Sequence, residues 1–238
     1  MALLPTNKTE KEISDPKVLT LYGPPKVGKT DFLSKLDKCL IIDTEDGSDY
    51  ISAYKVKIHN LDEFYALATE IATHKKTKGG YPYNFVALDT ITEFESWCEA
   101  DATKAYKETA IGSGFKGTSV LSLPNGAGYF WLRQSFDKYF AIVQKLAPKI
   151  IIIAHLREKI TDKNGTEVIS KDLDLTGKIR NMLAQRSDAI GYVYRDKEGK
   201  LRISFNTKED VTCGSREHLA GADIDADWSK IYPDEFRK

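Results

Sequence analysis

The chain has 238 residues, which is enough for one α/β domain with a sizeable core. Its 35 basic and 35 acidic residues give a net charge of +0, so any site for a polyanion must be a local patch. The three cysteines form no C-x-x-C pair, which indicates a reducing compartment. The start of the chain lacks an apolar signal region, and the aliphatic run 150–154 is too short to cross a bilayer. We therefore expect no membrane contact and a location in the cytoplasm, or in the cytoplasm of a host cell.

Strands and helices are predicted to alternate along the chain. Strands are expected at 18–22, 39–43, 54–58, 83–89, 150–154, 189–194 and 201–206, and helices at 31–36, 61–75, 91–109, 129–147 and 177–185. This order predicts an α/β fold with a mostly parallel sheet flanked by helices, and antiparallel strands at its C-terminal edge. Asn164-Gly165 predicts a hairpin turn within 156–175. We divide the chain into an N-terminal arm (1–16), a core (17–208) and an acidic C-terminal tail (209–238).

The sequence Gly-Pro-Pro-Lys-Val-Gly-Lys-Thr at 23–30 fits the phosphate-binding loop pattern G-x-x-x-x-G-K-[ST]. It lies between an expected strand and an expected helix, which is the context that this motif requires; the alternative is an ordinary glycine turn. Glycines let backbone N–H groups point at a phosphate, and the helix N-terminus favours an anion. Lys29 is expected to neutralise the β- and γ-phosphates and Thr30 to ligate Mg²⁺. The motif predicts a nucleoside triphosphate site formed by Gly23, Pro24, Pro25, Lys26, Val27, Gly28, Lys29, Thr30 and Asp31.

Carboxylates follow two further strands. Ligands of parallel sheets bind at the carboxyl ends of the strands, so these side chains are expected near the loop. Asp89 follows four apolar residues and is predicted to hold Mg²⁺; the alternative is a helix N-cap. Many ring-forming ATPases place a glutamate directly after this aspartate, but here the residue is Thr90. Glu45, after the neighbouring strand, is predicted to activate water instead; the alternative is a solvated turn residue.

This order of motifs resembles that of the RecA-like recombinases, over about residues 17–216. The matching features are the phosphate loop, Ile42-Asp43-Thr44-Glu45, Asp89, the Gly-rich segment 112–128, and the 150–157 strand ending in Ala-His-Leu-Arg. The resemblance is greatest to the short phage-encoded RecA-like proteins that are predicted to act in single-strand annealing and recombination. It implies a RecA-like P-loop NTPase core that uses ATP and Mg²⁺. It also implies that His155 senses the γ-phosphate; a buried, hydrogen-bonded histidine is the alternative.

The resemblance also implies two DNA-binding loops, at about 110–128 and 156–175. The residues expected to contact nucleic acid are Phe115, Lys116, Arg157, Lys159, Lys163 and Lys171. Two plain surface loops are the alternative. RecA-like ATP sites usually lie between subunits, which implies a homo-oligomer and a cation supplied by the neighbour. The candidates for that cation are Lys178, Arg180 and Lys208.

We therefore expect a Mg²⁺-dependent ATPase, stimulated by DNA, that binds single-stranded DNA and promotes annealing or recombination. Its catalytic residues would be Lys29, Glu45 and His155, and its partners could include a single-strand binding protein or a replication protein. The alternative is a nucleotide-gated adaptor or loader for a phage or host replication protein, with little DNA binding of its own. The neutral net charge and the acidic tail favour that alternative. A small-molecule kinase would need an acceptor pocket and an arginine-bearing lid, which we do not find in the sequence.

Overall fold

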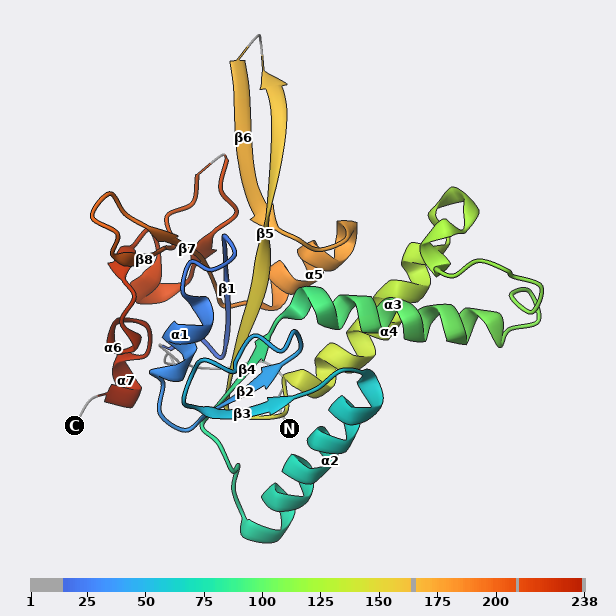
Figure 1. Ribbon diagram of the computed structural model, residues 1–238, viewed down its shortest axis with the longest axis horizontal. Helices are drawn as coiled ribbons and strands as arrows, with labels where there is room; N and C mark the ends of the chain where they lie inside the picture. Colours follow the sequence, from blue (N-terminus) through green and yellow to red (C-terminus); the bar gives the residue numbers. More distant parts are fainter. Residues whose placement is uncertain (1–14, 164–165, 209, 237–238) are drawn as a thin grey trace, which may run out of the picture.

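The computed structural model describes residues 15–163, 166–208 and 210–236, and for residues 161–163, 166–168 and 217 only the backbone. Its centre is a twisted sheet in the order β10-β8-β7-β1-β5-β4-β2-β3, to which β6 and β9 are added through β5 and β7 (Figure 1). The strands are β1 Val18–Gly23, β2 Cys39–Asp43, β3 Tyr54–Lys57, β4 Phe85–Asp89, β5 Lys149–Lys163, β6 Thr166–Leu173, β7 Ala189–Arg195, β8 Leu201–Ser204, β9 Gly214–Ser215 and β10 Asp223–Asp225.

The neighbouring strands β3, β2, β4, β5, β1 and β7 all run parallel, whereas β8 and β10 are antiparallel to their neighbours. Every residue of β1, β2 and β4 is buried, as expected for strands covered on both faces. The predicted fold class is thereby confirmed: a mostly parallel sheet is flanked by helices and carries antiparallel strands at its C-terminal edge.

Helices cover both faces of the sheet (Figure 1). They are α1 Lys29–Ser34, α2 Leu61–Lys78, α3 Ile91–Lys107, α4 Gly128–Val143, α5 Gly177–Arg186, α6 Trp228–Ile231 and α7 Pro233–Phe236, with the 3₁₀ turns η1 Val120–Ser122, η2 Pro124–Gly126 and η3 Glu217–Leu219. Helix α4 ends earlier than the predicted 147, and 144–147 form turns before Pro148. No helix in the described part of the chain combines the length and the apolar character needed to cross a membrane.

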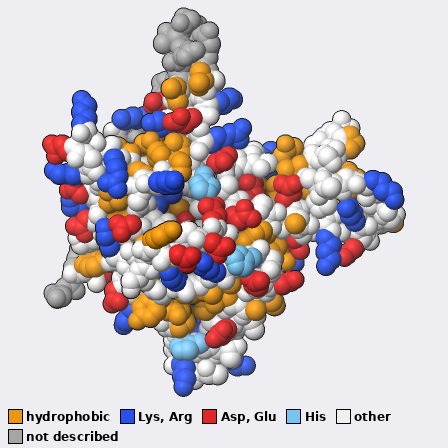
Figure 2. Space-filling model, in the orientation of Figure 1, with side chains coloured by type: hydrophobic (Ala, Val, Ile, Leu, Met, Phe, Trp, Pro, Cys, Tyr) orange, Lys and Arg blue, Asp and Glu red, His pale blue; other side chains and the backbone are white. Residues whose placement is uncertain are grey.

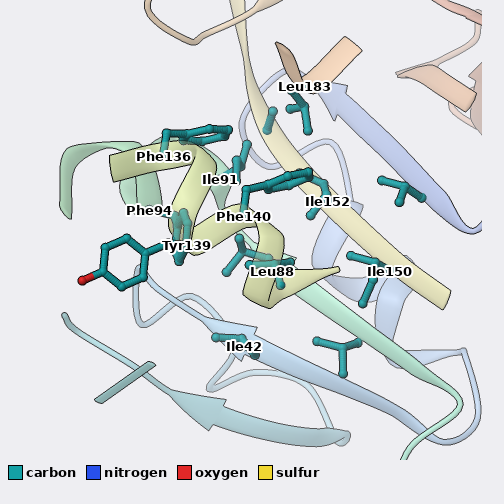
Figure 3. Packing of buried hydrophobic residues seen from close by; sticks show 14 of the residues in the cluster. Ile42, Leu88, Ile91, Phe94, Phe136, Tyr139, Phe140, Ile150, Ile152 and Leu183 are labelled. Atoms are coloured by element: carbon teal, nitrogen blue, oxygen red, sulfur yellow. The ribbon is translucent and has the colours of Figure 1, made fainter. Parts of the chain in front are cut away.

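Alternate residues of β5 serve two separate cores. Ile150 and Ile152 pack with Phe94, Phe136 and Phe140 from α3 and α4 (Figure 3). The side chains between them, Ile151 and Ile153, face the opposite side of the sheet, where they join α1 and the C-terminal helices. Strand β5 is therefore covered on both faces, and it lies in the middle of the sheet between β1, which leads into the phosphate loop, and β4.

Strand β5 continues far beyond the predicted end at 154. Its second half pairs antiparallel with β6, from Leu156 opposite Leu173 to Lys163 opposite Thr166, and forms a hairpin that projects from the body (Figure 1). The antiparallel pairing confirms the predicted hairpin, although its turn, Asn164-Gly165, lies outside the described residues. A second projection is the arm formed by α3, α4 and the connection 108–127 (Figure 1).

The segment expected as an acidic tail packs against the core wherever it is described. Strand β10 pairs with β8, and the indole of Trp228 stacks on Phe32 with ring centroids 4.0 Å apart. The Trp228 indole N–H also donates to the Phe32 carbonyl at 2.8 Å, and Tyr232 is fully buried. Acidic residues of this segment pair with neighbouring cations, such as Asp225 with Lys230. Residues 210–236 therefore complete the face of the sheet that carries α1.

Candidate nucleotide-binding site

The phosphate loop connects the end of β1 to the start of α1. A Cβ atom at Gly23 would stand 2.2 Å from the carbonyl oxygen of Val193, so only glycine lets β7 pass this close. Gly28 has φ 116°, in the region that favours glycine. Beside Gly28, the Arg195 guanidinium nitrogen lies 3.3 Å from where a Cβ would stand, a neighbour that sequence reasoning missed. Gly23 is thus required because β7 passes so close to it, and Gly28 is required because of its backbone conformation.

The ammonium group of Lys29 is held inside the loop. Its Nζ donates hydrogen bonds of 2.9 Å to the carbonyl oxygens of Gly23 and Pro24. Burial lowers the pKa of Lys29, and the negative charges of Asp89 and Glu45 act in the opposite direction. A desolvated cation at the N-terminus of a helix is suited to bind a phosphate.

Thr30 and Asp89 contact each other across the ends of α1 and β4. The Thr30 hydroxyl donates to Asp89 Oδ2 at 2.8 Å. Burial raises the pKa of Asp89 to about 6, although the Thr30 hydrogen bond and Lys29 both act to lower it. The N-cap of α3 is Thr90, whose hydroxyl accepts from Glu93 N–H, so Asp89 does not have the alternative capping role.

This hydroxyl and carboxylate pair fits a hard cation, because Mg²⁺ prefers oxygen ligands. No cluster of three or more His, Cys, Asp or Glu side chains that could hold a metal occurs among the described residues. A Mg²⁺ ion held by Thr30 and Asp89 would therefore take its other ligands from phosphate oxygens and water, which is its usual arrangement at nucleotide sites.

Glu45 and His155 also reach this edge of the sheet. The register places Asp43 opposite Asp89 and Gly23 opposite His155, so the strands that carry these residues end together. Glu45 Oε1 accepts a 2.6 Å hydrogen bond from the Thr90 hydroxyl and lies 2.8 Å from His155 Nε2. The hydrogen bond to His155 is the main cause that lowers the pKa of Glu45, and Glu45 in turn raises the pKa of His155. The structure therefore brings together Lys29, Thr30, Glu45, Asp89 and His155.

The turn that carries Glu45 is shaped by a residue that the sequence analysis did not assign. The carboxylate of Asp43 accepts the backbone N–H groups of Glu45, Gly47 and Ser48 at 2.8–3.2 Å. Burial acts to raise the pKa of Asp43, but hydrogen bonds from Ser48 and from the backbone N–H groups of Glu45 and Gly47 lower it. An aspartate at the end of a strand, followed by a glycine four residues later, is a recognisable turn signal. Asp43 thus orients the turn rather than contacting the loop.

The residues predicted to contact nucleic acid lie on the two projections and not at one place. Phe115, on the arm, is half-buried with its ring 5.4 Å from that of Tyr106, and Lys116 is exposed. Arg157 and Lys159 are exposed on β5, whereas Lys171 on β6 donates to the Tyr192 hydroxyl at 3.2 Å. The side chain of Lys163 lies outside the described part. Figure 2 shows acidic and basic side chains interspersed over most of this face, with several Lys or Arg side chains on the arm.

The three cations expected to serve a neighbouring subunit have different surroundings. Arg180 pairs with Asp172 at 2.5 Å. Lys178, in the first turn of α5, and Lys208 are exposed. Their role toward a second copy of the chain stays a prediction.

The geometry described above agrees with the comparison with known protein families. Residues 15–217 match the AAA domain family. The chain belongs to this family. The match spans the phosphate loop, the strand ends and the β5–β6 hairpin, and it confirms the predicted class of P-loop ATPase. Similarity to the phage-encoded annealing proteins stays a prediction.

Among solved structures, the crystal structure of the RadB recombinase is similar to this AAA domain chain. The two share 16% sequence identity with a TM-score of 0.43, over 89% of this chain and 87% of that chain. No curated protein sequence matches the chain.

Proposed function

We propose that this AAA domain protein is a Mg²⁺-dependent ATPase that binds single-stranded DNA and promotes annealing or recombination. One observation carries the proposal. Strand β5 runs without a break from His155, 2.8 Å from Glu45 at the nucleotide edge, through Arg157 and Lys159 into the projecting hairpin. The residue that we propose to sense the γ-phosphate and cations suited to a DNA backbone are thus on one strand, two to four residues apart.

At the nucleotide, each residue has a role that its surroundings favour. Lys29 and the loop N–H groups bind the phosphates, and Thr30 and Asp89 hold Mg²⁺, which neutralises phosphate charge when bound. The Glu45 carboxylate, whose pKa is lowered chiefly by the hydrogen bond to His155, can orient water and accept a proton from it. His155, hydrogen-bonded to Glu45, is placed to exchange that bond for one to the γ-phosphate.

The base of the hairpin is tied to the start of α3. His155 N–H donates to the Thr92 hydroxyl, and that hydroxyl donates to the carbonyl of Asp174, both at 3.3 Å. Asp174 N–H in turn donates to the His155 carbonyl at 3.0 Å. One threonine therefore joins the base of the hairpin, on both strands, to α3, whose N-cap Thr90 is the hydrogen-bond partner of Glu45. These contacts support coupling between nucleotide and hairpin.

The hairpin offers apolar surface as well as cations. Ile160 and Ile169 are paired opposite each other and are 63% and 46% exposed. Because side chains alternate along a strand, they lie on the face of the ribbon opposite to that of Arg157 and Lys159, and the two faces together suit a single strand, in which bases and phosphates are both accessible. A duplex would present mainly phosphates to such a ribbon.

The proposal is tested by measuring ATP hydrolysis with and without an unstructured oligothymidine, and oligothymidine binding with a non-hydrolysable ATP analogue or with ADP. We expect DNA to raise the hydrolysis rate and the analogue to strengthen a salt-sensitive binding. Replacing both Arg157 and Lys159 by alanine is expected to remove the stimulation and leave the DNA-free rate unchanged. Lys145→Ala, an exposed residue in the turn that follows α4, is the matched control. A wild-type protein that hydrolyses ATP yet binds no DNA at low salt favours the adaptor.

A further inference from the structure

A hollow of about 540 Å³ lies between α2 and the C-terminal end of α4. Its floor is apolar and consists of Ala68 and Ile71 from α2, Ile142 from the last turn of α4, and Leu146 just after that helix. Three of these side chains are buried, and that of Ile142 is partly exposed. A volume of this size falls in the range of ligand pockets, about 300–1,000 Å³.

The hollow opens at the edge of the sheet where the strands begin. Helix α2 ends at Lys78 and leads into β4, which starts at Phe85, and α4 ends at Val143 and leads into β5, which starts at Lys149. The phosphate loop lies at the opposite edge, where β1 ends at Gly23, and the β5–β6 hairpin projects beyond that same edge. A ligand in the hollow would therefore leave the nucleotide site and the hairpin free.

Three lysines frame the apolar floor from two sides. Lys75 and Lys76 belong to α2, and Lys145 belongs to the turn after α4. All three are exposed, and none has an acidic partner within the described part of the chain. None of the described residues that line the hollow is acidic, and Glu70, two positions after Ala68, lies on a different side of α2. Because the chain as a whole is neutral, these lysines are a local excess of positive charge.

The arrangement of charge and apolar surface specifies the ligand. An apolar group that enters the hollow has cations on both sides, so it is matched by a ligand with carboxylates on both sides of one bulky apolar group. A fatty acid has a single carboxylate and would pair with one wall only. A nucleic acid would need a free aromatic face for stacking, but Lys75 Nζ lies over the ring of Tyr81, 3.8 Å from its centroid. A peptide with acidic residues around one large apolar residue meets both demands.

We infer that this hollow is the docking site for an acidic segment of a partner protein. One large apolar side chain of the segment packs on Ile71, Ile142 and Leu146, and the carboxylates on either side of it pair with Lys76 and Lys145. The apolar side chain supplies most of the affinity, whereas the exposed charges select acidic partners and speed their association. This inference goes beyond the proposed function and does not depend on it.

The test uses the full chain and a fluorescein-labelled synthetic peptide with one phenylalanine between two pairs of aspartates, followed by polarisation without nucleotide or DNA. We expect binding that weakens as salt is added. A peptide with alanine in place of the phenylalanine is expected to bind about 10- to 150-fold more weakly, the effect of one buried apolar side chain. The double variant Lys76→Glu, Lys145→Glu is expected to lose roughly tenfold or more in affinity. The matched control, Lys104→Glu with Lys197→Glu, changes the net charge equally at exposed lysines elsewhere and should bind like the wild type.

Ala72→Phe tests the apolar part of the site. Ala72 lines the hollow and is exposed, so a phenylalanine there can fill the hollow with a ring of the chain itself and leave the core intact. We expect this variant to lose roughly tenfold or more in affinity for the peptide. Thr73→Phe, at the next residue of α2, which is also exposed, adds the same ring outside the hollow and should bind normally. All variants should melt close to the wild-type temperature.

Each other outcome overturns the inference. It fails if the wild-type protein binds no acidic peptide at low salt, or if Ala72→Phe and the charge reversal bind the peptide as well as the wild type does. If the free protein sediments as a dimer that Ala72→Phe dissociates, the occupant is a second copy of the chain. If the charge reversal abolishes oligothymidine binding and no peptide binds, the lysines serve nucleic acid. Failure of the proposed function shows separately, as a lack of ATP hydrolysis or DNA binding, whatever the peptide does.

Discussion

The imidazole of His155 and the carboxylate of Glu45 meet at 2.8 Å although their strands, β5 and β2, are not neighbours in the sheet. Strand β4 lies between them, and Thr90, just after its end, donates to the same oxygen of Glu45. Three strand ends thus converge on one carboxylate oxygen. The hydrogen bond to His155 is the main cause that lowers the pKa of this carboxyl group.

If Glu45 activates the attacking water, Glu45→Gln should separate binding from turnover. We expect the variant to bind a fluorescent ATP analogue with the wild-type affinity and to release phosphate about 10²- to 10⁴-fold more slowly. Asp46→Asn is the matched control, because the neighbouring carboxylate pairs with Lys57 outside the site. Unchanged phosphate release by the glutamine variant would remove Glu45 from the mechanism.

Lys29→Ala should weaken nucleotide binding itself. The ammonium group makes charge-assisted hydrogen bonds, and losing such contacts to a phosphate corresponds to roughly 10- to 150-fold in affinity. Isothermal titration with ATP measures this effect. Lys35→Ala, at the other end of α1, removes only an exposed pair with Asp31 and should bind normally. Equal affinities for both variants would contradict the assignment.

If Thr30 ligates Mg²⁺, Thr30→Ala should raise the Mg²⁺ concentration needed for half-maximal ATP binding. Thr30→Ser retains the hydroxyl and is expected to behave like the wild type. Asp89→Asn should shift the Mg²⁺ requirement in the same direction, because a neutral amide is a poorer ligand for a hard cation than a carboxylate. A Mg²⁺ titration that is unchanged in both Thr30→Ala and Asp89→Asn would place the ion elsewhere.

Glu95 should make stability depend on pH. Burial raises the pKa of this carboxyl group to about 7, so folding favours its protonated form. Its destabilising effect is absent below the unfolded pKa of about 4.3 and grows as the pH rises to about 7, reaching roughly 3 kcal/mol. Glu95→Gln retains an acceptor for Thr176 N–H without this penalty. We therefore expect urea unfolding to show the variant gaining stability over the wild type between pH 5 and pH 8; a constant difference would argue against a buried ionising group.

Trp228 should contribute strongly to the stability of the whole fold. Truncating its buried ring to alanine opens a cavity beside Phe32, and such changes cost about 3–5 kcal/mol. Trp228→Phe retains the stacking and loses the hydrogen bond to the Phe32 carbonyl, about 1 kcal/mol. Urea unfolding measures both, with Phe236→Ala as an exposed control in the same segment. If Trp228→Ala unfolds like the wild type, residues 210–236 do not stabilise the core.

The features that were predicted correctly depend on short stretches of sequence. The phosphate loop is a contiguous motif, and the buried strands are continuous apolar runs whose order along the chain fixes the sheet class. The length of β5 was missed because 156–163, Leu-Arg-Glu-Lys-Ile-Thr-Asp-Lys, has the composition of a surface loop. These polar residues lie beyond the ends of the neighbouring strands β1 and β4, where β5 pairs with β6.

What could not be predicted depends on residues far apart in the chain. The contact between Glu45 and His155 follows from the register of strands that are not adjacent, and no local pattern encodes that register. The packing of Trp228 on Phe32 joins residues 196 positions apart. An acidic composition suggested a tail because the sequence does not show which cations neutralise it.

The pairing of β5 with β6 also determines how the hairpin could move when a nucleotide binds. Eight residue pairs in register, from Leu156 opposite Leu173 to Lys163 opposite Thr166, make the predicted hairpin a continuous two-stranded ribbon. A stiff ribbon anchored at His155 would respond to the nucleotide by tilting as a lever, without first becoming ordered. Backbone amide exchange along Leu156–Ile160 would then be slow both with and without ATP, while the distance from the hairpin to the arm would change.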